Sequence, residues 1–386
     1  MPVLFLIVFV DILGFGLLLP LLPFYVQRIG AGPEVITAVL GLYSLAQVIA
    51  APVWGRVSDR YGRKPVLAFT CIGLGLSYVV LAYADSLALV VASRIIGGLM
   101  AGNIAAAQAY VADVTSPETR AKGMGILGAA FGLGFIVGPS IGGLFAGASV
   151  EGADYRAPAL AAMTLSFAAA AGAVFFLKES LSAEARTHME RRATFAEKMR
   201  IALQRQALLV LVVTGFLIIT AWAQFETVFA LWVHRVFAFG PREIGFVFGF
   251  MGAVNVLVQG ALMGMLTRRF GERRLALVAG ALFVSGYLAV AVSTSPTTLL
   301  MSCAVLAFAS ALFNPSVTSL VSKEAASRER GAVMGAYQSA TALGRVAGPS
   351  VSGSLFAAGM TLPYLVAAAL AAGGLALIAF RGKHRE

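Results

Sequence analysis

The chain has 386 residues, of which 59% are hydrophobic and only 12% are charged, and its mean hydropathy is +0.86. This balance excludes a soluble globular protein of this size and indicates a polytopic membrane protein. The formal net charge of +11 does not point to nucleic acid, because the cations lie in short loops between apolar runs. Both cysteines, Cys71 and Cys303, lie inside apolar runs, so we expect neither a disulfide nor a metal site.

Twelve apolar runs are long enough to cross a bilayer as helices, since about 20 apolar residues span its hydrocarbon core. They lie at roughly 2–26, 34–55, 65–84, 87–111, 123–147 and 157–177, and then at 206–233, 242–266, 274–293, 296–321, 331–357 and 361–380. The sequence therefore predicts an all-α membrane protein with two six-helix bundles, residues 1–178 and 206–386. A polar linker, 179–205, joins them and could carry an amphipathic helix that lies on anionic headgroups.

The distribution of Lys and Arg predicts the orientation. Of the 29 cations, 23 lie in the even-numbered loops, the linker and the C-terminal tail, whereas four lie in the other loops. The remaining two, Arg94 and Arg345, fall within apolar runs. By the positive-inside rule, both termini and the linker face the cytoplasm.

The two halves of the chain repeat each other, which predicts a pseudo-symmetric transporter with its substrate path between the halves, near the bilayer midplane. Matching positions 210 residues apart are Gly134 and Gly344, Gly138 and Gly348, and Pro139 and Pro349. Matching positions 209 residues apart are Gly55 and Gly264, Arg60 and Arg269, and Gly62 and Gly271.

A charged hairpin, Gly55–Lys64, follows the second run and carries five charges in ten residues. Its glycines permit a close backbone approach and a tight turn. The spacing G-x-x-x-D-R-x-G-R-K resembles the signature loop of the major facilitator superfamily, which lies between the second and third helices. The alternative interpretation is that these charges only set the topology.

That resemblance implies a conformational latch. In the family, the loop acid pairs with basic loop residues and caps the eleventh helix in the outward-facing state, and the last arginine of the loop reaches an acid at the end of the fourth helix. The second copy of the loop lacks the acid, so we expect a latch on one side only. The residues assigned to the latch are Gly55, Asp59, Arg60, Gly62, Arg63 and Asp113.

Arg94 lies well inside the fourth run, where an unpaired charge costs about 2.5 kcal/mol or more. It begins a stripe, spaced by four residues and expected on one helix face, of Arg94, Gly98, Gly102, Ala106 and Tyr110. The pattern R-x-x-x-G-x-x-x-G resembles the fourth-helix motif of proton-driven drug antiporters. The resemblance implies that Arg94 tunes or relays the transported proton; a purely structural pairing is the alternative.

Gly134, Gly138, Pro139 and Gly142 lie in the fifth run. They resemble the G-x-x-x-G-P-x-x-G motif of antiporters, which is generally weak or absent in symporters. Small residues four apart let helices touch backbone to backbone, and the proline bends its helix. The resemblance favours antiport, and a glycine-rich packing face is compatible with it.

Two acids, Asp11 and Glu226, lie within the first and seventh runs. A carboxylate in a low-dielectric interior can hold a proton near neutral pH, so either acid could be the coupling site, together with Arg94. Asp11 matches the acid of the first-helix motif of the antiporter family. Alternatively, Asp11 could only cap or orient its helix, and Glu226 could be the partner of an arginine. Arg345 could pair with either acid or bind an anionic substrate group.

The similarity to the tetracycline/proton branch of the drug:H+ antiporters covers nearly the whole chain. It includes Tyr110–Asp113, Gly134–Pro139 and Gln224–Trp232. It departs where residues tied to tetracycline and proton handling in that branch are replaced by Ser77, Ser285 and Asn255. These departures argue against tetracycline as the substrate and move the proton role toward the two acids in the first and seventh runs.

The leading interpretation is a proton-coupled efflux antiporter of small amphipathic drugs in the bacterial inner membrane. We expect a monomer that is driven by the proton gradient. It should need no cofactor and no metal, and it should bind no nucleic acid. The alternatives are a symporter or uniporter of a small metabolite or organic anion, or a non-transporting receptor. An enzyme has no support in the sequence. Residues predicted to line the substrate cavity are Phe15, Gln47, Asn103, Gln108, Phe131, Trp222, Gln224, Phe229, Asn255, Asn314, Gln338 and Arg345.

Overall fold

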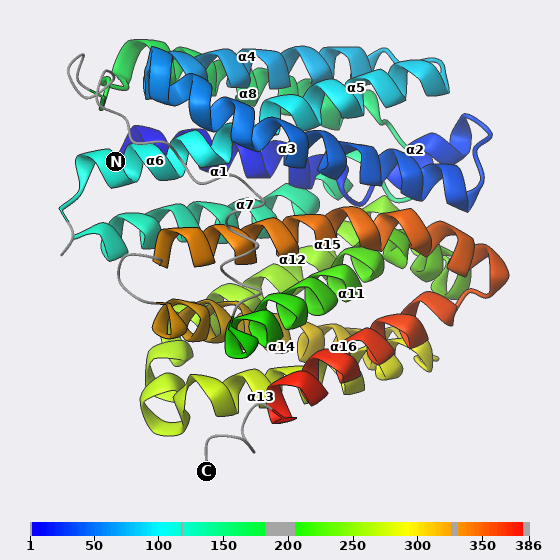
Figure 1. The fold of residues 1–386 in the computed structure, drawn as a ribbon. Helices are drawn as coiled ribbons and strands as arrows, with labels where there is room; N and C mark the ends of the chain where they lie inside the picture. Colours follow the sequence, from blue (N-terminus) through cyan, green and yellow to red (C-terminus); the bar gives the residue numbers. More distant parts are fainter. Residues whose placement is uncertain (1, 117–118, 182–204, 326–329, 381–386) are drawn as a thin grey trace. The chain divides into compact units, whose positions relative to one another are not determined.

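The fold is given by a computed structural model that describes residues 2–116, 119–181, 205–325 and 330–380, which contain helices and no strand. The first half of the chain (Figure 1) contains α1 (Pro2–Leu18), α2 (Leu22–Arg28), α3 (Pro33–Tyr61), α4 (Arg63–Ala82), α5 (Leu87–Met100), the 3-10 turn η1 (Ala101–Asn103), α6 (Ile104–Val114), α7 (Arg120–Ala146) and α8 (Arg156–Phe176). The second half contains α11 (Gln206–Phe237), α12 (Pro241–Leu257), the π-helical turn η2 (Val258–Leu262), α13 (Met263–Ala291), α14 (Pro296–Glu324), α15 (Arg330–Ala358) and α16 (Leu362–Phe380).

The helices confirm the predicted membrane fold. Within the described residues, nine helical stretches are long and apolar enough to cross a bilayer, and the pair α1 and α2, bent by 43°, makes ten. One stretch, Pro241–Ala291, is 51 residues long, and Gly271 breaks it with non-helical backbone angles (φ 74°, ψ 156°). With that stretch divided in two and α15 added, each of the twelve predicted runs has a helical counterpart.

The described chain forms two compact units. Unit 1 comprises Met1–Glu190 and Ala238–Gly252, and unit 2 comprises Arg191–Phe237 and Ala253–Glu386. The first part of α12 thus groups with the N-terminal helices, whereas the sequence placed all of 206–386 in the second bundle. The two predicted domain boundaries stay predictions. Of the predicted linker, only 179–181 and 205 belong to the described residues, and the C-terminal tail after 380 lies outside them.

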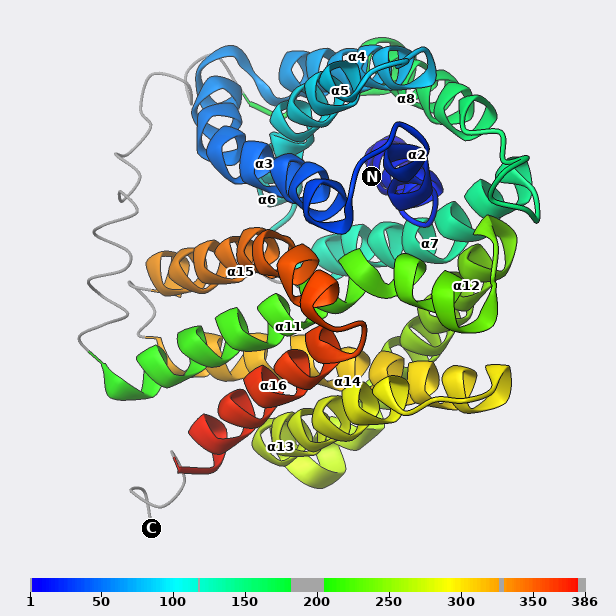
Figure 2. The same cartoon turned by 90° about the vertical axis from the view of Figure 1, so that its right-hand side faces the viewer.

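In unit 1, α1 packs against α7 and α8, α4 packs against α5 and α8, and α3 packs against α5. Seen along their axes, α1 and α2 are surrounded by α3, α4, α7 and α8 (Figure 2). Lipid tails are as apolar as leucine, so close packing, rather than the hydrophobic effect, holds such helices together. The first helix is therefore held by close packing against α7 and α8.

In unit 2, α11 packs against α15 and α16, and α13 packs against α14 and α16. Its core is aromatic. The Phe225 ring contacts Phe229 at a centroid distance of 4.9 Å, Trp222 at 5.6 Å and Tyr287 at 6.0 Å. Aromatic pairs at these distances contribute about 0.5–1.5 kcal/mol each beyond their buried area.

Candidate functional site

The glycine motif of α7 lies directly against α1. A Cβ built on Gly138 would lie 2.8 Å from the Leu13 carbonyl oxygen, and one built on Gly142 would lie 2.0 Å from the Leu17 carbonyl oxygen. A Cβ on Gly134 would lie 2.8 Å from the Ile12 side chain. Only glycine permits such an approach. The motif therefore fixes the backbone of α1 immediately after Asp11.

Unit 2 contains the same contact between α15 and α11. A Cβ built on Gly348 would lie 2.7 Å from the Thr220 carbonyl oxygen, just as one built on Gly138 would lie 2.8 Å from the Leu13 carbonyl oxygen. When these two contacts are matched, the counterpart of Asp11 is Ile218, and Glu226 lies eight residues further on, about 12 Å along the helix. The two acids occupy equivalent helices, as expected, but at different depths.

Asp11 is buried in the interior of α1, so it does not cap the helix end. The Asn103 side chain of η1 lies close enough to its carboxylate to act on it. The 3-10 turn interrupts the run that the sequence predicted as one helix. Two side chains of α3 donate to carbonyls at this interruption: Gln47 Nε2 to Ala101 at 3.1 Å and Trp54 Nε1 to Leu99 at 2.6 Å. The break thus places a buried amide beside the acid.

Arg94 is 2% exposed. Its guanidinium carbon lies 5.7 Å from the centre of the Tyr43 ring, and its Nε lies 3.4 Å from Ser93 Oγ. Its Nη2 has no hydrogen-bond partner among the described residues. An unsatisfied buried donor is costly, so a partner for Nη2 would stabilise this arginine.

Tyr78 of α4 connects the two charged residues. Both Asp11 and Arg94 lie close enough to act on it electrostatically. Its hydroxyl lies against Gly14, one turn after Asp11, where a Cβ would be 3.1 Å away. Sequence reasoning did not select Tyr78, although a tyrosine beside Ser77 is a detectable signal. Unit 1 therefore holds a buried acid, a phenol and an arginine from three different helices.

The glycine stripe after Arg94 packs against α3. A Cβ built on Gly98 would lie 2.3 Å from the Tyr43 carbonyl oxygen, and one built on Gly102 would lie 2.8 Å from the Trp54 ring. Ser77, which replaces an acid of the tetracycline pumps, is buried and donates to the Leu74 carbonyl at 2.7 Å. It is satisfied within its own helix.

In unit 2, Glu226 is partly buried, and the exposed Arg345 of α15 is near enough for its charge to act on the acid. This favours Glu226 as the partner of Arg345. Tyr287 also lies close enough to interact electrostatically with Glu226.

Two residues predicted to line the cavity are instead fully buried in the core of unit 2. Phe229 packs against Phe225, and Gln224 donates its amide to the Pro363 carbonyl. In this structure the Phe229 ring contacts aromatic neighbours and the Gln224 amide has a backbone acceptor; their assignment to the cavity stays a prediction. Of the other predicted lining residues, Asn103 is buried, Phe15, Gln47, Phe131, Trp222 and Asn255 are partly buried, and Gln108, Asn314, Gln338 and Arg345 are exposed. Asn255 lies 3.4 Å from Ser310 Oγ, and the exposed Ser285 donates to the Leu282 carbonyl.

The turn of the predicted hairpin consists of a single residue. Helix α3 continues to Tyr61 and α4 begins at Arg63, so only Gly62 forms the turn, with φ 108°. Gly55 lies inside α3 and has no part in the turn, contrary to the prediction. Gly271, with φ 74°, makes the same turn in unit 2. Left-handed backbone of this kind is the reason that both copies keep a glycine.

Arg63 is 3% exposed and lies at the centre of a charge network. It donates to Asp59, to Ser58 Oγ at 2.7 Å and to Asp113 at 3.0 Å. The predicted Arg63–Asp113 contact is therefore present. Arg60 is outside the network, because its guanidinium lies over the Tyr61 ring at 5.5 Å. The predicted cap on the eleventh helix concerns the other unit and stays a prediction.

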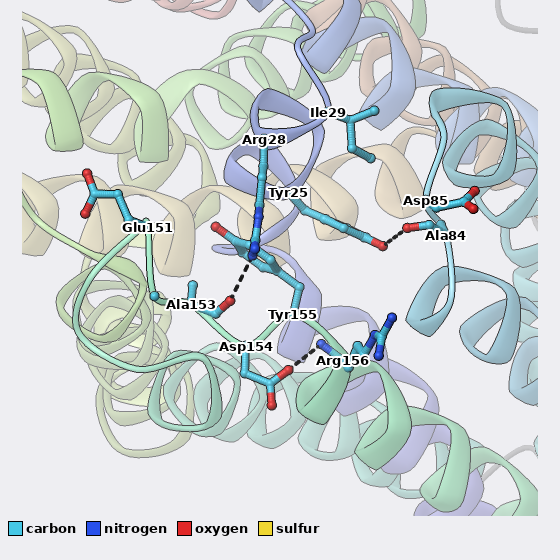
Figure 3. A pocket seen from close by; sticks show the side chains of 11 residues that line it. Tyr25, Arg28, Ile29, Ala84, Asp85, Glu151, Ala153, Asp154, Tyr155 and Arg156 are labelled. Carbon is cyan, nitrogen blue, oxygen red and sulfur yellow. Dashed lines mark hydrogen bonds between the residues drawn. The ribbon is translucent and has the colours of Figure 1, made fainter.

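One cavity, of about 750 Å³, lies at the opposite end of unit 1 (Figure 3). The Tyr25 and Tyr155 rings stack at 5.1 Å, the Tyr25 hydroxyl donates to the Ala84 carbonyl at 2.5 Å, and Arg28 donates to the Ala153 carbonyl at 3.5 Å. Its lining residues come from α2 and the turn after it, from the α4–α5 loop, and from the α7–α8 loop with the start of α8: Tyr25, Arg28, Ile29, Ala84, Asp85, Glu151, Gly152, Ala153, Asp154, Tyr155 and Arg156. None of the predicted site residues lines it.

Comparison with known proteins adds a consistent set of matches. The family model of the Major Facilitator Superfamily matches residues 4–263 and 259–386. Multidrug resistance protein 2 of Bacillus subtilis (strain 168) is 31% identical over 378 residues, covering 96% of this chain and 92% of that protein. The class C tetracycline resistance protein of Escherichia coli is 30% identical, covering 93% and 91%. The solved structure of the human organic anion transporter MFSD10 (TETRAN) is 27% identical, with a TM-score of 0.74 and 98% of both chains covered.

Proposed function

We propose, on the premise that this chain belongs to the Major Facilitator Superfamily, that it is a proton-coupled antiporter that exports small amphipathic drugs. It would act by alternating access as a monomer in the bacterial inner membrane, with both termini in the cytoplasm and with no enzymatic activity. Bacterial relatives that cover more than nine-tenths of the chain are named for multidrug and tetracycline resistance, which supports drug export. The glycine motif of α7 supports antiport over symport.

The observation that carries the proposal is the buried group of Asp11, Tyr78 and Arg94. A guanidinium stays protonated in proteins, so Arg94 is a fixed positive charge and not a proton carrier. When Asp11 loses its proton, its negative charge acts on Tyr78 of α4, on which the charge of Arg94 in α5 also acts. When Asp11 takes up a proton, its charge no longer acts on Tyr78. Protonation can therefore change the relative stability of two helix arrangements, which is the requirement for coupling.

The test is transport by the purified protein in proteoliposomes. Asp11→Asn removes the titrating group while keeping its shape, so we expect uphill transport to be abolished while counterflow exchange continues. Glu226→Gln is the matched variant in unit 2. If both variants still pump against a gradient, proton coupling does not reside in either acid.

The substrate class is tested by measuring substrate-induced proton release with a panel of lipophilic cations, tetracyclines and organic anions. We expect lipophilic cations to release protons. Tetracycline is expected to be inactive, because Ser77, Ser285 and Asn255 replace the residues tied to it in the resembled branch. Proton release by none of these compounds would contradict drug/proton antiport.

The second candidate function is transport of an organic anion. Two observations favour it: Arg345 is exposed, and Arg94 has an unpaired Nη2. The similarity to a human organic anion transporter, at 27% identity, supports the same substrate class. Uptake or exchange of organic anions that is lost in Arg345→Ala, without proton release by cations, would favour this second function.

A further inference from the structure

The chain that leaves α8 turns back over the first turn of α4. The segment Lys178–Leu181 is the described beginning of the predicted linker. The Tyr110 hydroxyl, near the end of α6, donates to the Lys178 carbonyl at 3.0 Å. This bond holds the segment beside the Arg63 network.

Glu179 caps α4 from a distance of more than 100 residues in sequence. Its carboxylate accepts from the backbone N–H of Arg63 at 2.9 Å and of Lys64 at 3.3 Å. It also accepts from the backbone N–H groups of Ser180 at 3.0 Å and Leu181 at 3.2 Å. One carboxylate therefore joins the start of α4 to the start of the linker.

Helix α4 needs this cap because its own sequence lacks one. The residue before the helix, Gly62, has no side chain that could accept a hydrogen bond. The first turn of α4 contains two cations and no acid. Cations at a helix N-terminus are unfavourable with the helix dipole, whereas a carboxylate there is favourable. Glu179 supplies both the missing acceptor and the missing negative charge.

Ser180 makes the second connection. Its hydroxyl donates at 3.0 Å to Asp113 Oδ2, the same oxygen that accepts from Arg63 Nε at 3.0 Å. The two consecutive residues thus hold the two partners of one ion pair: Glu179 holds the backbone of Arg63, and Ser180 holds the carboxylate of Asp113.

We propose that Glu179 and Ser180 are positioning residues of the Arg63 network, so that the beginning of the linker is part of the latch. Only the expected effect of Glu179 and Ser180 variants on the transport rate rests on the proposed transport function. The geometry of the network, and its local stability, do not depend on which substrate is carried.

The first experiment is hydrogen exchange of the full-length protein in lipid nanodiscs. In Glu179→Ala, we expect the amides of Arg63 and Lys64 to exchange about fivefold faster, as for the loss of a typical side-chain N-cap. Glu179→Gln keeps one acceptor and should show a smaller increase. Lys178→Ala is the matched control, since only the backbone carbonyl of Lys178 takes part, and it should exchange like the wild type.

The second experiment measures transport by the same variants in proteoliposomes. We expect Glu179→Ala to lower the maximal rate with KM unchanged, because the latch and not the substrate site is altered. Glu179→Gln should restore part of the rate. Ser180→Ala should have a smaller effect, since Arg63 still holds Asp113.

Unchanged exchange in Glu179→Ala, or the same increase in Lys178→Ala, would overturn the inference. Faster exchange with a normal maximal rate would overturn the positioning role. If Glu179→Ala does not fold, the test uses Glu179→Gln. An exchange rate and a transport rate of Glu179→Gln that both equal those of the wild type would show that the charge of Glu179 is not needed, and would overturn the inference. Failure of the wild type to transport any drug would contradict the proposed function but would leave the exchange result intact.

Discussion

The networks around Arg63 in unit 1 and Glu272 in unit 2 occupy equivalent places with opposite charges. Arg63 donates to Asp113, and at the matching positions, 209 and 210 residues later, Glu272 accepts from Lys323. The loop residue is a cation and the helix-end residue an acid in one unit, and the reverse holds in the other. What the two copies share is therefore an ion pair between the turn and the neighbouring helix end, not the sign of either partner.

The two pairs differ most in burial. The Arg63 side chain is 3% exposed and that of Asp113 21%, whereas the Lys323 side chain is 62% exposed and that of Glu272 18%. Arg63 also donates hydrogen bonds to Asp59 and Ser58. In unit 2, Glu272 accepts from Lys323 and from Ser319 at 3.1 Å. Removal of one partner from a buried network is far more costly than from an exposed pair.

The largest effect is expected for Arg63→Ala. This change leaves Asp59 and Asp113 without their common cation, and breaking a buried pair in this way costs about 3–5 kcal/mol. We expect transport to be lost and the thermal midpoint of the purified protein to fall clearly.

Arg60→Ala is the matched control, because Arg60 is an exposed neighbour whose guanidinium lies over the Tyr61 ring. A wild-type thermal midpoint in Arg63→Ala, or an equal fall in Arg60→Ala, would show that the buried network does not stabilise unit 1.

The glycine contacts give the next effect in size. Unit 2 carries Ser352 where unit 1 carries Gly142, 210 residues earlier. Gly142→Ser should nevertheless be poorly tolerated, because a Cβ at this position would lie 2.0 Å from the Leu17 carbonyl oxygen. Overpacking of this kind costs about 1–3 kcal/mol, and we expect lower thermal stability and slower transport as α1 and Asp11 are displaced.

Gly128→Ser on the same helix is the control, since a Cβ there meets nothing within 4 Å. If Gly142→Ser were as stable and as active as Gly128→Ser, the close approach of α7 to α1 would not be required.

Sequence reasoning predicted much of this architecture. The run lengths and the internal repeat predicted the twelve helices, the glycines of the charged loop predicted the tight turn, and the resemblance to the family implied the Arg63–Asp113 contact. The glycine motif was predicted as a packing face, and it is one. Apart from the Arg63–Asp113 contact, these features depend on local pattern or on spacing that a duplication repeats.

The remaining features depend on contacts that no local pattern encodes. The η1 break is held by Gln47 and Trp54 from another helix, and the cap of α4 comes from Glu179. The burial of Phe229 and Gln224 follows from the aromatic packing of α11 against its neighbours. The eight-residue difference in depth between Asp11 and Glu226 appears only when the helix contacts are matched in space.

The smallest effect is expected for the exposed pair in unit 2. Lys323→Ala removes a single partner of Glu272, and exposed pairs of this kind contribute about 0.2–1 kcal/mol. The charge-swapped pair Glu272→Lys with Lys323→Glu should restore much of the thermal midpoint, because Lys323 is exposed and no second charge contacts the pair among the described residues. In unit 1, Arg63→Asp with Asp113→Arg should not restore it, because Asp59 and Glu179 would face the wrong charge.

The pH dependence of this pair follows from the same contacts. The hydrogen bond from Lys323 holds the pKa of Glu272 below its usual value of 4.5. A carboxyl group with a lowered pKa contributes stability above its unfolded-state pKa, and that contribution disappears as the pH falls through the folded-state pKa. The difference in thermal midpoint between wild type and Lys323→Ala should therefore be constant from pH 7 to pH 5 and shrink only below about 4.5. A difference that already disappeared between pH 7 and pH 5 would show that Glu272 is not the group that Lys323 stabilises.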